Sequence, residues 1–108
     1  MSISELDKQF VERKLLPYFG IKSLNLKYSD SKKKYPDIWV SLDKIPTITV
    51  TNEWKKQSMN ERRKRLVHEA LHVMGLEHGK YGKYIYSTFP RFDTYSKKVY
   101  QDILKLMG

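Results

Sequence analysis

Residues 68–78 constrain this chain more than any other stretch, because three histidines and a glycine stand there at fixed spacings. The segment reads HEALHVMGLEH, and the three histidines of the whole chain all lie in it. Four residues of an α-helix advance by about 400°, so His72 returns to the face of His68 one turn further on. The spacing therefore predicts a helix that presents two imidazoles to one metal ion.

The other positions of this segment fit the same interpretation. Gly75 is expected to end the helix, since glycine adopts the left-handed conformation at little cost. The resulting turn would bring His78 back toward the first two histidines. Glu69 lies next to the ligand line, where a general base for a metal-activated water is needed. Three neutral imidazoles with one open position are typical of a catalytic Zn²⁺ site.

The helix that carries these histidines is also predicted from its own residues. Ser58 followed by Glu61 forms a capping box, and the run to Met74 contains no Gly or Pro. Apolar side chains gather on one side of the helical wheel, centred about 160° from His68 and His72. These are Leu66, Val67, Ala70, Leu71, Val73 and Met74. The pattern predicts a core on one side and a cleft on the other.

The segment 68–78 resembles the signature of the metzincin clan of zinc-dependent endopeptidases, H-E-x-x-H-x-x-G-x-x-H. The C-terminal residues are similar to the final helix of its matrixin branch. The matching positions are Tyr95, Ser96, Ile103, Leu106 and Gly108. The small chain is similar in size to a minimal single-domain peptidase of this clan.

The resemblance implies roles for five residues. His68, His72 and His78 would be the zinc ligands. Glu69 would be the base and later the proton shuttle, and Gly75 would form the turn that permits the third ligand.

Three positions depart from the pattern of the resembled family. Tyr86 stands where matrixins carry the methionine of a turn beneath the metal, and Lys98 and Val99 replace two adjacent aspartates. Tyr86 either fills the space of the methionine or donates a hydrogen bond to the developing oxyanion.

The N-terminal half predicts the remainder of an α+β domain. Ser2 and Glu5 form a capping box for a helix through about Leu16, ending before Pro17 and Gly20. Its expected buried face comprises Leu6, Phe10, Val11 and Leu15. Strand-like segments follow at 21–28, 38–42 and 48–51, with a loop at 29–37. We expect one domain, residues 1–108, in which a small mixed sheet packs on the metal-binding helix with N- and C-terminal helices.

The segment 47–51 is the predicted strand nearest to the histidines in sequence, and we expect it to border the cleft. In the resembled family an edge strand there pairs with extended peptide by main-chain hydrogen bonds. The alternative is an ordinary edge strand without a ligand.

Composition narrows the classes of function. The chain lacks cysteine and carries a net charge of +9, so neither disulfides nor inhibition through a cysteine ligand is available. No stretch has the form of a signal peptide or a membrane span, and we expect a soluble, cytoplasmic protein.

The Lys and Arg residues occur in scattered groups outside any nucleic-acid motif, so we expect no nucleic-acid partner. They either cover a solvated surface or steer acidic substrates.

The sequence thus predicts a zinc endopeptidase that hydrolyses unstructured, casein-like protein substrates. A catalytically silent zinc-binding interaction domain is the main alternative. A basic nucleic-acid-binding module and a toxin or inhibitor-like interaction protein are two others, and the last has no positive sign in the sequence. Because the chain has no cysteine to block the metal, self-association is expected to restrain its activity.

Overall fold

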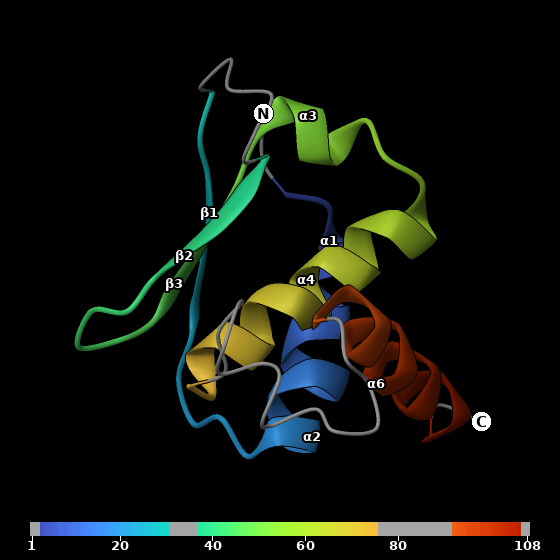
Figure 1. Ribbon diagram of the computed structural model, residues 1–108. Coiled ribbons are helices and arrows are strands. Elements are labelled where there is room, and N and C mark those ends of the chain that lie inside the picture. Colours follow the sequence, from blue (N-terminus) through green and yellow to red (C-terminus); the bar gives the residue numbers. More distant parts are fainter. Residues whose placement is uncertain (1–2, 31–36, 76–91, 107–108) are drawn as a thin grey trace.

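The computed structural model describes residues 3–30, 37–75 and 92–106 (Figure 1). It consists of an N-terminal helical segment, a three-stranded sheet, and three later helices. The N-terminal segment comprises α1 (Glu5–Phe10), η1 (Val11–Leu15) and α2 (Leu16–Phe19), and the strands are β1 (Asn25–Tyr28), β2 (Ile38–Ser41) and β3 (Thr47–Val50). The later helices are α3 (Asn52–Lys55), α4 (Met59–Val73) and α6 (Phe92–Leu106). The predicted α+β class with a small mixed sheet is confirmed.

The N-terminal helix differs from its prediction at both ends. Its N-cap is Ser4, whose hydroxyl accepts a hydrogen bond from the Asp7 amide at 3.3 Å, not Ser2. It also continues through Pro17 to Gly20, which has φ 69°. Proline cannot donate to the helical ladder, and its ring clashes with the carbonyl four residues earlier. The π-helical turn of η1, in which Leu16 N–H bonds the Val11 carbonyl, relieves that clash.

The sheet has the order β1-β3-β2, with β1 parallel and β2 antiparallel to β3. The β2–β3 hairpin projects away from the helices (Figure 1). Because side chains alternate between the two faces of a strand, Ile48 and Val50 point into the core while Thr47 and Thr49 point outward. Ile48 and Val50 are fully buried.

The core lies where α4 packs against β2, η1 and α6. Phe10, Val11 and Leu15 are buried as predicted, but Leu6 is 63% exposed. The N-terminal segment meets α6 through an edge-on contact between the rings of Phe10 and Tyr100, 6.2 Å apart. The helix that carries the histidines is thus held on three sides by other elements.

Across the described ranges, no helix combines the length and the apolar character that crossing a membrane requires.

Candidate metal centre

Helix α4 begins and ends where the sequence predicted. The Ser58 hydroxyl accepts from the Glu61 amide at 3.2 Å, which caps the first turn. The last turn closes with Gly75 N–H bonded to the His72 carbonyl at 2.9 Å, and Gly75 has φ 89°. A Cβ at Gly75 would meet no heavy atom within 4 Å, so backbone conformation and not space favours glycine here.

The predicted amphipathic pattern of α4 is confirmed over most of its length. Leu66, Val67, Ala70 and Leu71 are buried, whereas Met74 is 47% exposed. The two histidines are half-buried on the same helix. The helix therefore reaches the core with one side and keeps its imidazoles accessible on another.

His68, Glu69 and His72 form a group that could hold a metal ion. One ligand atom from each lies within 4.8 Å of the other two. The imidazole ring centroids are 5.0 Å apart, and their planes make an angle of 66°. Imidazole nitrogens are ligands that Zn²⁺ and other borderline divalent cations bind well. The donor set thus fits a transition metal, and His78 and Tyr86 lie outside the described residues.

Glu69 has an environment that sequence reasoning missed. The residue is 8% exposed, so it is buried beside two accessible histidines. Burial raises the pKa of Glu69 from 4.5 to about 7, and the negative charge of Asp37 makes a smaller contribution in the same direction. A carboxyl group with a pKa near neutrality is suited both to accept and to return a proton.

Asp37 lies immediately before β2 and is held by three polar contacts. Its carboxylate lies 3.1 Å from an Arg65 guanidinium nitrogen, and its carbonyl oxygen accepts from both the Thr51 amide, at 3.0 Å, and the Thr51 hydroxyl, at 2.7 Å. Nothing near residue 37 in the sequence signals this role, because the sheet brings Asp37 to α4. Only knowledge of the strand pairing would have found it.

The strand beside α4 is not the one that was predicted. β3, which contains most of segment 47–51, is the central strand and pairs on both sides. β2 is the edge strand that packs against α4. The prediction was wrong because proximity in sequence does not determine strand order: the hairpin places the earlier strand outside the later one.

Helix α6 buries two of the residues on which the resemblance to matrixins rests and exposes a third. Ser96 and Ile103 are buried at 4% and 1% exposure, but Leu106 is 74% exposed. Lys98, at a position where matrixins carry an aspartate, lies 2.7 Å from the Asp102 carboxylate one turn later. Lys98 therefore forms an ion pair within α6.

The basic run at 62–65 on α4 is occupied by contacts inside the molecule. Arg62 pairs with Asp7 at 3.1 Å, Lys64 with Glu61 at 3.2 Å and Arg65 with Asp37 at 3.1 Å, while Arg63 lies 4.9 Å from the ring centre of Phe10. Asp7 and Asp37 are both buried. Arg62 and Arg65 therefore link α4 to the N-terminal helix and to the residue before β2, whereas the Lys64–Glu61 pair lies within α4.

No family, curated protein or solved structure that we compared matches this chain. Its function must therefore be argued from the motif and the geometry of the centre.

Proposed function

We propose that this protein is a zinc-dependent endopeptidase of the metzincin type. The observation that carries the proposal is the grouping of His68, Glu69 and His72, whose ligand atoms lie within 4.8 Å of one another on a capped helix. The resemblance of residues 68–78 to the metzincin signature supplies the expected third ligand, His78. Peptide hydrolysis is the chemistry for which this combination of ligands and a neighbouring carboxylate is suited.

His68, His72 and His78 would hold the zinc through neutral imidazole nitrogens. When bound, Zn²⁺ supplies a Lewis acid that polarises a carbonyl and acidifies water. The fit rests on the donor set, since three imidazole nitrogens would leave a fourth position of the metal for substrate or water. Gly75 would permit a chain reversal between the second and third ligands, because its φ of 89° is costly for residues with a side chain.

Glu69 would act first as base and then as acid. Its carboxylate takes a proton from water as the water oxygen attacks the carbonyl carbon of the scissile peptide. The same carboxyl group then gives the proton to the nitrogen of the leaving amine as the C–N bond breaks. Burial in the metal-free protein supports this role, because it raises the pKa of Glu69 from 4.5 to about 7, the range of a carboxyl group that can both take up and return a proton.

The substrate would be an extended, unstructured protein segment. β2 packs against the helix that carries the histidines, and among the described residues it pairs with β3 alone. An extended peptide added to the outer edge of β2 would form main-chain hydrogen bonds and run past α4. Folded proteins offer few such segments, so we expect the protein to prefer casein-like substrates.

Tyr86 is proposed to stabilise the oxyanion through its phenol. Tyr86→Phe should then lower turnover and leave zinc affinity nearly unchanged. Unchanged turnover would leave Tyr86 as a residue that only fills the place of the family's methionine.

Two variants of α4 test the proposal. Glu69→Ala should bind zinc at the wild-type stoichiometry and lose nearly all cleavage of casein, because only the proton carrier is removed. His72→Ala should lose both zinc and cleavage. Cleavage by Glu69→Ala at the wild-type rate would refute the mechanism.

A catalytically silent zinc-binding domain is the second candidate. The replacement of the family's turn methionine by Tyr86, and of its aspartates by Lys98 and Val99, favours it. Zinc retained at one ion per chain, with no protein cleaved at any concentration, would select this candidate.

We further propose that association between copies restrains the peptidase, because the chain has no cysteine that could block the metal. Specific activity should fall as the protein concentration rises across the range in which oligomers form. A constant specific activity over that range would exclude such restraint.

A further inference from the structure

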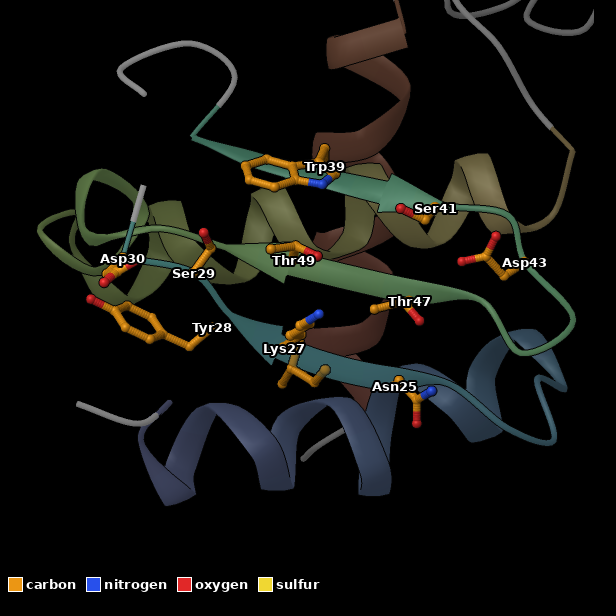
Figure 2. Close-up of a pocket in the computed structure, with 11 residues that line it drawn as sticks. Asn25, Lys27, Tyr28, Ser29, Asp30, Trp39, Ser41, Asp43, Thr47 and Thr49 are labelled. Carbon is orange, nitrogen blue, oxygen red and sulfur yellow. The ribbon is translucent and has the colours of Figure 1, made fainter. Parts of the chain in front are cut away.

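The outer face of the sheet carries a hollow of about 940 Å³. Figure 2 shows it on the side of the sheet away from α4, with side chains from all three strands standing over it. Its lining consists of Asn25, Leu26, Lys27, Tyr28, Ser29, Asp30, Trp39, Ser41, Asp43, Thr47 and Thr49. Its volume is within the range of small-ligand sites. It is separate from the metal centre, because β3 turns Ile48 and Val50 toward the core and its two threonines toward the hollow.

The strand register arranges the outward side chains in two rows. Thr49 lies between Lys27 on β1 and Trp39 on β2. Thr49 is only 6% exposed although no element covers this face in the described structure, because its neighbours on both sides screen it. The second row places Thr47 between Asn25 and Ser41. The hollow thus has an aromatic ring at one row and small polar groups at the next.

The lining of the hollow is mostly polar. It combines one indole ring with hydroxyls, an amide, an ammonium and two carboxylates, which together offer both hydrogen-bond donors and acceptors. The aliphatic member, Leu26, packs its side chain against the core. Hydrophobic peptide side chains would therefore find little complementary surface here.

The hollow differs in charge from the molecule as a whole. The chain as a whole carries +9, yet the lining of the hollow contains one lysine, Lys27, and two aspartates, Asp30 and Asp43. A site for nucleic acid or another polyanion would concentrate cations. This balance of charge instead suits a ligand that is neutral and rich in hydroxyl groups.

From these observations we infer that the hollow is a binding site for neutral oligosaccharides. A sugar ring has an apolar C–H face and a polar edge. The C–H face would lie on Trp39, since the negative face of an aromatic ring attracts polarised hydrogens. Asn25, Lys27 and Asp43 would then bond hydroxyl groups of this ring and of the neighbouring sugar units. Sheet faces bind oligosaccharides in the same manner in OB-folds.

The test is affinity electrophoresis of the full chain through gels that contain a neutral polysaccharide. The probes are soluble glucan, mannan, xylan and galactan, with chitin oligosaccharides followed by tryptophan fluorescence. Because these probes are uncharged, retardation cannot arise from the protein's positive charge. At least one probe should retard the wild type, and Trp39→Ala should weaken that binding by roughly tenfold or more.

Three variants keep the result interpretable. Trp39→Phe retains a ring and the sheet packing, and should bind more tightly than Trp39→Ala. Asp43→Asn changes an exposed residue and should weaken binding without affecting the fold. Tyr18→Ala removes a 39% exposed aromatic residue on α2 and is the matched control, which should bind as the wild type does. Circular dichroism confirms that each variant is folded.

Two results would overturn the inference. One is that none of the probes retards the wild type, or that a probe that retards the wild type binds the folded Trp39→Ala variant equally well. The other is that single-stranded poly(U) binds at physiological salt and is lost in Trp39→Ala, which would make the face a nucleic-acid site.

Discussion

Replacing Glu69 by glutamine should stabilise the metal-free protein above neutral pH. Burial and the charge of Asp37 raise the pKa of Glu69 from 4.5 to about 7, so the folded state disfavours the ionised form. Well below pH 4.5 the carboxyl group is protonated in both the folded and the unfolded state, so its raised pKa does not lower the free energy of unfolding. The cost grows as the pH rises toward 7 and is complete above it.

The magnitude follows from the two pKa values. One pH unit corresponds to about 1.4 kcal/mol, so the penalty is roughly 1 kcal/mol at pH 5 and roughly 3 kcal/mol at pH 8. Glu69→Gln removes it, because the amide has a similar shape and no charge. The free energy of unfolding of this variant should therefore exceed that of the wild type by an amount that rises with pH.

Urea denaturation in the presence of a chelator, from pH 5 to pH 8, measures this difference. The matched control is Glu12→Gln, which changes an exposed carboxylate on η1 and should alter stability little at any pH, because its side chain remains solvated in both states. A Glu69→Gln protein no more stable than the wild type at pH 8, or a gain independent of pH, would refute the account of Glu69.

Three further predictions concern the same centre. Gly75→Ala should lower the free energy of unfolding by about 1–2 kcal/mol through backbone strain alone, because φ is 89° and no atom blocks a Cβ. Gly20→Ala, at φ 69° with equally open space, should have the same effect. A thermal unfolding curve that is unchanged in either variant would contradict this. Asp37→Asn should lower the free energy of unfolding, measured with urea, by about 1–3 kcal/mol, because Arg65 loses the carboxylate 3.1 Å away. An Asp37→Asn protein as stable as the wild type would show that the ion pair contributes nothing to stability. When zinc binds at pH 6.5, the wild type should release about half a proton or more per ion in addition to what Glu69→Gln releases, because the metal charge displaces the Glu69 proton. Calorimetry in buffers of different ionisation enthalpy measures the number of protons released. Equal release by the two proteins would argue against a protonated Glu69.

Local features of the centre could be predicted from the sequence. The cap at Ser58, the helical phase of the two histidines and the left-handed Gly75 all depend on residues within one or two turns of each other, and the structure has all three. Such features follow from the geometry of a single helix. The same reasoning failed at Pro17, where a π-helical turn lets the helix continue past a proline.

Features that depend on distant pairings could not be predicted. Asp37 affects Glu69 only because β2 pairs outside β3 and packs against α4. Strand order is decided by which arrangement buries Ile48 and Val50 best, and that is a property of the whole core. The two rows of the outer hollow depend on the same register, so neither Trp39 nor Lys27 could be assigned to a site from periodicity alone.

The most direct test of the proposed function is the cleavage of a fluorescently labelled casein by the zinc-loaded protein, with Glu69→Gln at the same concentration and zinc content. Wild-type cleavage should stop on addition of a chelator and resume when zinc is restored, and the rate for Glu69→Gln should be lower by several orders of magnitude. Equal cleavage by the two proteins, or cleavage that a chelator does not affect, would contradict the assignment of a zinc peptidase with Glu69 as its base.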